Sequence, residues 1–234
     1  MMLNQYKEQH AYLVALDSII FGFDGENLKV LLVKRGVEEN TWSLMGGWLQ
    51  PREGLEQAAA RIVHELTGLT NVYLEQLSAF GEPDRDPIAR TISIAYFSLV
   101  KIDDYESKIS ETFHAQWFSI YDLPTLLFDH GDMVSLALKR LRSKASQHPI
   151  GFELLPEKFT LPQLQKLYEA IYNIEFDKRN FSRKILSMKL LNKLDEKQKG
   201  FSKRGAYYYS FDEEQYNQIT SAFINIIPTS EIEL

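Results

Sequence analysis

The sequence predicts an α+β protein, in which a mixed sheet sandwiched between helices is followed by a smaller module of two helices and a basic β-hairpin. Two observations support this fold class. Segments rich in β-branched and aromatic residues surround an amphipathic helix in the first 147 residues, whereas two helical stripes lie close together after residue 160. Charge divides the chain in the same way. Residues 1–150 carry a net charge of −6 and residues 151–234 are neutral, but 178–204 alone carries +8.

The composition is that of an ordinary globular protein of one or two domains, with 234 residues, 44% apolar and 25% charged. It argues against disordered, collagenous and repeat chains. The sequence has no cysteine, which excludes disulfides, a thiolate nucleophile and cysteine-ligated metal sites. There is no apolar stretch of about 18 residues and no basic start followed by an apolar segment. We therefore expect a cytoplasmic protein with no signal peptide and no membrane partner.

In the first half, two strands over 11–23 and 28–33 flank a hairpin-type turn at Asp24-Gly25. The glycine pair Gly46-Gly47 within 42–48 suits a tight turn or a close backbone approach. An amphipathic helix then begins near Leu55 and ends at Gly68. The further expected elements are strands over 72–80, 91–100 and 115–120 and a helix over 132–145.

The amphipathic helix lies within a residue spacing that resembles the Nudix box, carried by Gly47, Glu53, Arg61, Glu65, Gly68 and Leu69. Nudix hydrolases place three carboxylates on one face of this helix, where they bind Mg²⁺ on a diphosphate. Here Ile62 and Leu66 occupy two of these three positions, and Mg²⁺ requires oxygen ligands. The resemblance therefore implies a Nudix-like fold with a degenerate catalytic site, and we expect no enzyme activity, no metal and no cofactor.

The segment 80–96 resembles the region after the box in Nudix-related transcriptional regulators of the NrtR type. Its proline-stiffened loop could present Asp84 and Arg85 to a polar ligand, or the charges of the loop could satisfy one another. The expected effector-binding residues are Trp48, Glu53, Glu65, Asp84 and Arg85. Each has a simpler alternative: core packing for Trp48, a structural role for Glu53 and a surface position for Glu65.

The second half begins with a capping-box pair, Thr160 and Gln163, at the start of a helix with Pro162 in its first turn. A second helix is expected over 179–194, with Phe181, Ile185, Met188 and Leu191 on its inner side. Its opposite side presents basic and amide side chains. Two helices joined by a tight connection, the second of them basic, indicate a helix-turn-helix.

A glycine-flanked basic turn over 199–205 precedes a tyrosine-rich strand over 206–211, which suggests a β-hairpin wing. Residues 161–184 are similar to the C-terminal domain of the same regulator family. The expected DNA contacts suit guanine, adenine and phosphate groups, and they are Arg179, Asn180, Ser182, Arg183, Lys184, Ser187, Lys203 and Arg204. Tyr207 is expected to pack within the strand. The alternative is a helical dimerisation domain with a solvated basic face.

These segments define a Nudix-like effector domain over 1–147, a linker over 148–157 and a winged helix-turn-helix over 158–234. The resemblance implies a homodimeric repressor that binds double-stranded operator DNA and senses a small molecule. Family members sense ADP-ribose-type metabolites or govern pentose use, and the missing carboxylates favour a sugar such as L-arabinose, as in the AraR-type branch.

Two alternatives belong to other classes of protein. One is a Nudix hydrolase acting on ADP-ribose or a related nucleoside diphosphate compound, with a metal site rebuilt from Glu56, Glu82 or Asp84. The other is a sugar-binding protein whose basic module contacts RNA or a partner protein.

Overall fold

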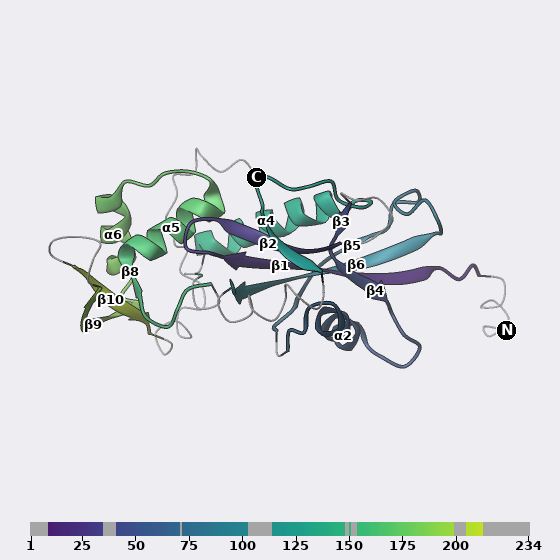
Figure 1. Cartoon of the computed structure of the whole chain (residues 1–234), viewed down its shortest axis with the longest axis horizontal. Helices are drawn as coiled ribbons and strands as arrows, with labels where there is room; N and C mark the ends of the chain where they lie inside the picture. The colour runs from purple at the N-terminus through teal and green to yellow at the C-terminus, as the bar shows by residue number, and fades with distance from the viewer. Residues whose placement is uncertain are drawn as a thin grey trace.

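The structure, a computed structural model, describes residues 9–34, 41–70, 72–102, 114–147, 150, 154–198 and 205–212. Within these residues, a larger α/β part forms one end of an elongated molecule. A smaller part, made of helices and a hairpin, forms the other end (Figure 1).

A seven-stranded mixed sheet is the centre of the larger part, as far as the structure describes it. Its strands are β1 (Leu13–Phe23), β2 (Leu28–Lys34), β3 (Trp42–Ser43), β4 (Met45–Trp48), β5 (Glu75–Phe80), β6 (Thr91–Lys101) and β7 (Ala115–Ser119). Strand β1 pairs in parallel with β6 and antiparallel with β2 and β4. The order β3-β2-β1-β6-β5 therefore places β1 in the middle, with β7 added along β2.

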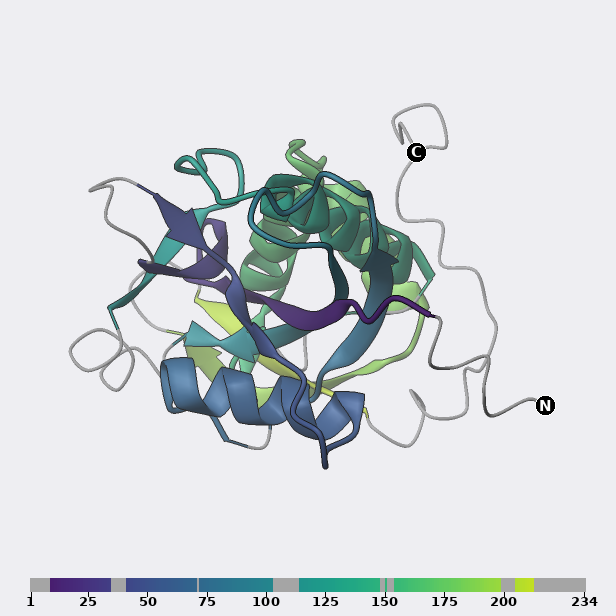
Figure 2. The same ribbon diagram turned by 90° about the vertical axis from the view of Figure 1, so that its right-hand side faces the viewer.

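Helices α2 (Leu55–Thr67) and α4 (His130–Gln147) cover opposite faces of this sheet (Figure 2). The alternation of side chains along β1 explains the two layers. Ile20 packs with Ile62 of α2, whereas its neighbour Ile19 packs with Met133 of α4. The prediction of a mixed sheet between helices is confirmed.

Three glycine positions act as the sequence suggests. The Asp24 carboxylate accepts hydrogen bonds from the backbone amides two and three residues later, and Gly25 has φ of 97°. Gly46 lies within β4 rather than in a turn, and it permits the expected close approach, because a Cβ at this position would collide with Asp17 Oδ1. Helix α2 ends at Gly68, which has φ of 72°.

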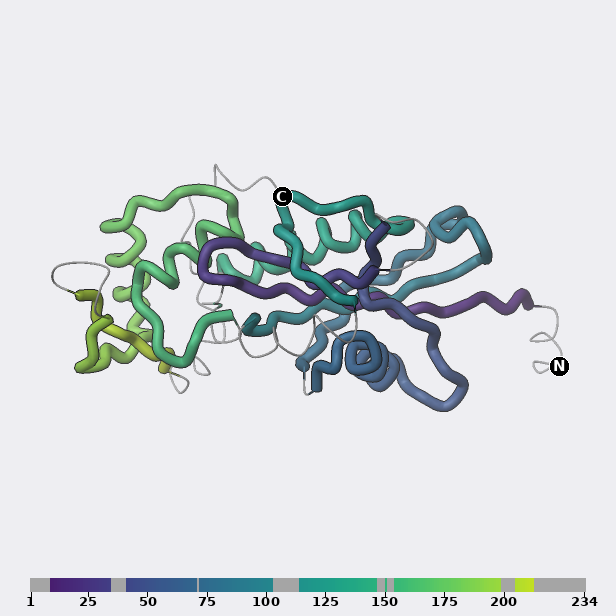
Figure 3. The backbone as a smooth tube through the Cα atoms, viewed as in Figure 1, coloured from purple at the N-terminus to yellow at the C-terminus, as the bar shows by residue number. Residues whose placement is uncertain are grey.

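The smaller part is a winged helix, as predicted. Its elements are β8 (Phe159–Thr160), α5 (Leu161–Tyr172), α6 (Lys178–Ser187), β9 (Leu191–Gln198) and β10 (Ala206–Phe211). The strands form a sheet in the order β8-β10-β9. Strand β1 begins at the end of the molecule that lies farthest from α6 and this sheet (Figure 3).

The expected helix over 179–194 is wrong beyond Ser187, where α6 ends. Lys189 has φ of 56°, and Leu191 begins a strand that pairs with β10, opposite Phe211. Leu191 and Leu194 are three residues apart, which also suits a helix, so periodicity alone did not separate the two structures. Similarly, β5 begins at Glu75 rather than at residue 72.

The two parts share a continuous apolar core. One cluster contains Ile19 of β1, Met133 of α4 and Leu167 of α5, and Ile150 and Leu154 are buried in it. The last two residues fall in the expected linker over 148–157, so part of that segment packs into the core. The domain limits 1–147 and 158–234 stay a prediction. None of the described helices has the length and apolar character needed to span a bilayer.

Candidate nucleic-acid interface and effector site

Helix α6 lies at one end of the molecule (Figure 1), and most of its polar residues are exposed to solvent. The Asp177 carboxylate caps the helix by accepting a hydrogen bond from Asn180 N at 2.8 Å. Phe181 and Ile185 are buried and fix the opposite side of the helix on the core. The exposed polar residues are Lys178, Arg179, Asn180, Arg183, Lys184 and Ser187, while Ser182 is half-buried and the apolar Leu186 is also exposed. The structure therefore brings the predicted α6 contacts onto one helix.

Within α6, some of these side chains hold each other. Arg183 Nη2 donates a hydrogen bond to Asn180 Oδ1, and the Ser187 hydroxyl donates to the Lys184 carbonyl at 2.7 Å. The first contact joins the Asn180 amide and the Arg183 guanidinium, both exposed, before any partner binds. Arg and Asn are the side chains that read guanine and adenine edges in the major groove.

The predicted wing is present as the antiparallel pair β9–β10, but Lys203 and Arg204 lie outside the described residues. The sequence reasoning missed a second feature of the wing. The Lys193 and Lys197 ammonium groups lie 3.6 and 4.3 Å from the ring centroid of Tyr207. A bulge in β9 places these lysines opposite Tyr209 and Tyr207.

This face of the wing extends past the core. Tyr209 and Phe211 pack against the core at its inner end, whereas Tyr207, two residues farther out, is 38% exposed. Tyr207 therefore packs against two lysines of the neighbouring strand at the surface and not against the core. The expected helix over 179–194 includes Lys193 but not Lys197, so no sequence pattern pairs these two lysines.

The Nudix box is organised around Arg61. Its guanidinium donates two hydrogen bonds to Glu53, at 2.9 and 2.6 Å, one to Glu65 Oε2 at 3.0 Å and one to the Trp48 carbonyl at 3.0 Å. The contact with Arg61 holds the pKa of the Glu53 carboxyl below its usual value. Glu53 also accepts a hydrogen bond from Gln50 N at 2.8 Å, so it braces the loop before α2.

Two of the three carboxylate positions of the box carry apolar side chains. Ile62 is buried and would lie 2.9 Å from a Cβ on Gly47, and Leu66 packs at the edge of the core. Glu65 and Glu53 both pair with Arg61. No group of three or more His, Asp or Glu side chains that could hold a metal ion occurs among the described residues.

Of the remaining predicted effector residues, Trp48 is 48% exposed at the end of β4, and Asp84 is exposed on the loop over 81–90. Arg85 is different, because its side chain is only 3% exposed. It donates hydrogen bonds at 2.9 and 2.6 Å to Asp129, which immediately precedes α4. Arg85 therefore pairs with a residue outside the loop, so the charged residues of the loop do not pair only with one another.

Arg85 belongs to a buried polar network that lies next to β4. Its Nη2 lies 3.9 Å from Asp17 Oδ2, which also accepts a hydrogen bond from the Ser93 hydroxyl at 2.6 Å. His130 Nε2 lies 3.5 Å from Asp17 Oδ1, and His130 Nδ1 accepts a hydrogen bond from Leu44 N at 3.2 Å. The network connects β1, β6, the residue before β4 and the start of α4. Sequence patterns gave no sign of it.

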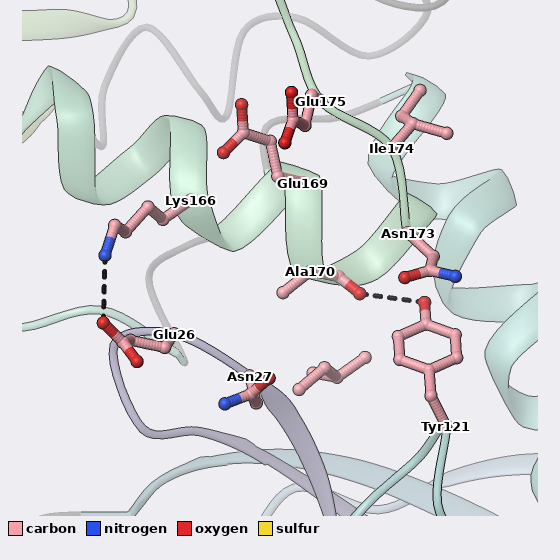
Figure 4. Close-up of a pocket in the computed structure, with 10 residues that line it drawn as sticks. Glu26, Asn27, Tyr121, Lys166, Glu169, Ala170, Asn173, Ile174 and Glu175 are labelled. Atoms are coloured by element: carbon pink, nitrogen blue, oxygen red, sulfur yellow. Dashed lines mark hydrogen bonds and ion pairs between the residues drawn. The ribbon is translucent and has the colours of Figure 1, made fainter.

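A pocket of about 450 Å³ lies at the junction of the two parts, between the β1–β2 turn and α5 (Figure 4). Lys166 of α5 lies 3.3 Å from Glu26 Oε1 in that turn. On the other side, the Tyr121 hydroxyl donates to the carbonyls of Ala170 and Ile171 at 2.9 and 3.0 Å. Burial raises the pKa of the Tyr121 phenol, which keeps this donor protonated.

Two family models match the chain. Residues 11–137 match the NUDIX domain and residues 151–211 match the NrtR DNA-binding winged helix domain. The ADPR responsive transcriptional repressor NtrR of Acinetobacter baylyi is 31% identical over 211 residues, which cover 88% of this chain and 84% of that protein. The ADP-ribose pyrophosphatase of Methanocaldococcus jannaschii is 33% identical over 124 residues, covering 52% of this chain and 70% of the enzyme.

Solved structures match over both parts. Shewanella oneidensis NrtR complexed with a 27mer DNA has a TM-score of 0.77 at 26% identity, covering 92% of this chain and 99% of that chain. A structure described simply as NrtR of the same organism has a TM-score of 0.73 at 27% identity, covering 87% and 96%. The chain therefore belongs to the NrtR family of transcriptional regulators, in which a Nudix domain is followed by a DNA-binding winged helix.

Proposed function

We propose that this protein is a repressor that binds double-stranded operator DNA and releases it when ADP-ribose binds to its Nudix domain. The observation that carries the DNA-binding half is the exposed side of α6. Arg179, Asn180, Arg183 and Lys184 point away from a helix that Phe181 anchors on the core. An α-helix with such side chains fits the major groove, where it can read base edges.

The wing supplies a second set of contacts in this proposal. Lys193 and Lys197, held on the Tyr207 ring, would neutralise phosphates beside the groove that α6 enters. Their stems are already placed, so less side-chain entropy is lost on binding. Lys203 and Arg204 remain predicted contacts at the tip of the wing.

ADP-ribose replaces the expected sugar as the proposed effector. The Acinetobacter baylyi relative is named as ADP-ribose responsive and spans nearly the whole chain, whereas no comparison supports L-arabinose. Trp48 offers an exposed ring beside the box for a base or ribose, and Asp84 is accessible on the neighbouring loop. Glu53 and Glu65, both paired with Arg61, would shape this surface, and Arg85 would act from inside the protein.

We further propose that the Nudix domain binds ADP-ribose without hydrolysing it. Ile62 and Leu66 replace two carboxylates of the box, and Glu65 is paired with Arg61. The hydrolase remains the second candidate, because an ADP-ribose pyrophosphatase matches the Nudix half. Release of AMP from ADP-ribose in the presence of Mg²⁺, abolished by Glu65→Gln, would favour that candidate.

The proposed functional unit is a cytoplasmic homodimer. Two copies would place their α6 helices in successive major grooves, about 34 Å apart, on a palindromic operator. Sedimentation velocity with and without DNA tests this: two protomers per operator duplex are expected, and a single bound protomer would contradict it.

Arg183→Ala tests the DNA-binding half directly. Fluorescence anisotropy with duplex DNA from the region upstream of the protein's own gene should show operator affinity reduced about 10- to 100-fold, since a guanidinium contact with a base contributes about 1–3 kcal/mol of discrimination. Arg140→Ala is the matched control, because Arg140 is an exposed arginine on α4. Unchanged affinity in Arg183→Ala would show that α6 does not read the operator.

A further inference from the structure

Helix α4 is shared between the two parts of the molecule. Met133 and Ala137 pack on the Nudix sheet, and the same cluster continues through Leu141 to Leu164 and Leu167 of α5. One straight helix therefore contacts both the effector-binding part and the DNA-binding part.

The second half of α4, together with Tyr121 after β7, closes the end of α5. The last carbonyls of a helix have no partner within the helix. Here Tyr121 donates to Ala170 and Ile171, and Arg142 Nε donates to Ile171 at 2.9 Å. Arg142 Nη2 also donates to the Tyr121 hydroxyl at 3.2 Å. Side chains of the Nudix part thus cap a helix of the winged helix.

One hydrogen bond runs in the other direction, from a side chain of the winged helix to the backbone of α4. The Tyr172 hydroxyl donates to the Arg142 carbonyl at 2.7 Å. The 450 Å³ pocket lies beside these contacts, because Tyr121 and Ala170 line it, and at its other end the exposed pair between Lys166 and Glu26 joins α5 to the β1–β2 turn (Figure 4). Exposed pairs contribute little, so Tyr121 and Arg142 provide the directional contacts that orient α5.

The position of α5 in turn determines the position of α6. The ring of Tyr168 in α5 lies 5.7 Å from that of Phe181 in α6, and Phe176 in the connection lies 5.6 Å from Phe181. Gln165 donates a hydrogen bond to the Phe176 carbonyl at 2.9 Å. Because these rings are packed in the core, a tilt of α5 carries the DNA-facing helix with it.

The first turn of α4 is connected to the loop over 81–90 and to β4, which contains Gly47 of the box. Asp129, whose carbonyl accepts from Met133 N at 3.2 Å, binds Arg85 of the loop over 81–90. Asp17 connects this network to β4, because it lies against Gly46 with no space for a Cβ. A ligand that shifts β4 or this loop must therefore displace the first turn of α4 or break buried polar contacts.

We propose that α4 couples the two domains, with Tyr121 and Arg142 as the positioning residues that set the orientation of α5 and α6. This inference rests on the proposed response to ADP-ribose. Neither residue lies at the box or on the DNA-facing side of α6. Their loss should therefore weaken the coupling between the two ligands while each ligand alone still binds.

The experiment measures the ratio of operator Kd values with and without saturating ADP-ribose in the full chain. Couplings between sites are commonly about 5- to 150-fold. We expect Tyr121→Phe and Arg142→Gln each to reduce the wild-type ratio at least threefold, with the ADP-ribose Kd of the DNA-free protein changed less than twofold. Arg140→Gln on the same helix and Tyr73→Phe, which is 80% exposed, are matched controls that should retain the ratio.

Tyr172→Phe is an independent variant that removes only the hydrogen bond from the Tyr172 hydroxyl to the Arg142 carbonyl and keeps every charge. A wild-type ratio of one would refute the proposed ADP-ribose response itself. A wild-type ratio well above one that is unchanged in all three junction variants would refute the coupling role of α4 alone. A reduced ratio in folded variants, together with reduced controls, would also contradict it, because the effect would then not be specific to the junction.

Discussion

Replacing Arg85 by glutamine tests whether this residue acts from inside the protein rather than at the ligand. Its guanidinium makes two hydrogen bonds to Asp129 and lies 3.9 Å from Asp17, with 3% of its side chain exposed. Glutamine cannot supply the charge or the paired donors. Two carboxylates would then remain near one another without a cation.

The structure sets the size of the effect. Removing one partner of a buried ion pair costs about 3–5 kcal/mol of unfolding free energy. The Asp129 side chain keeps 19% exposure, which places the expected loss near the lower limit, about 3 kcal/mol. For a chain of this length, that corresponds to a decrease in Tm of about 6–12 °C.

Urea unfolding followed by tryptophan fluorescence measures this loss. The matched control is Arg90→Gln, on the same loop, since Arg90 donates to backbone carbonyls near the surface and lies over the Tyr12 ring rather than pairing with a buried carboxylate. That variant should lose less than about 1.5 kcal/mol. If Arg85→Gln lost less than about 1 kcal/mol but abolished ADP-ribose binding, Arg85 would contact the ligand and the buried network would not have the role assigned to it.

Three further predictions concern other parts of the molecule. A double variant that carries Lys193→Gln and Lys197→Gln should have a shallower slope, by about 1.8, when the logarithm of the DNA association constant from anisotropy is plotted against the logarithm of salt concentration. Lys139→Gln on α4 should leave the slope unchanged. A double variant with the wild-type slope would exclude these wing contacts. Asp177→Ala should lower the unfolding free energy by about 1 kcal/mol, measured in urea, because α6 loses its cap; no loss would contradict the capping role. Arg61 lowers the pKa of Glu53, so this carboxylate stabilises the fold above its ordinary pKa of 4.5 and loses that effect as pH falls. Glu53→Gln should therefore lower the Tm at pH 7. The difference in Tm between this variant and the wild type should shrink toward pH 3.

Local patterns predicted most of the fold. The α2 stripe ending at Gly68 and the pairing of Thr160 with Gln163 at the start of α5 both occur as expected, with Thr160 N donating to Gln163 Oε1 at 2.8 Å. These features depend on residues within one or two helical turns of each other. The strand β9 was missed because the left-handed conformation of Lys189, which ends α6, has no sequence signal at a lysine.

The candidate site was less accessible to sequence reasoning. The predicted α6 residues could be placed together because they share one helix, and their contacts with DNA stay a prediction. Arg85 could not, because its partner Asp129 is 44 residues away and only the tertiary fold brings them together. The cluster of Lys193 and Lys197 on Tyr207 depends on a bulge, which is also a property of strand pairing.

One titration tests the central claim most directly: the affinity of the wild-type protein for its upstream duplex, measured by anisotropy with ADP-ribose, with L-arabinose and without either. The account predicts tight, salt-sensitive binding that ADP-ribose weakens at least fivefold, about 1 kcal/mol of coupling, and that L-arabinose leaves unchanged. Operator affinity unaffected by ADP-ribose, or no preference for the upstream duplex over unrelated DNA, would contradict it.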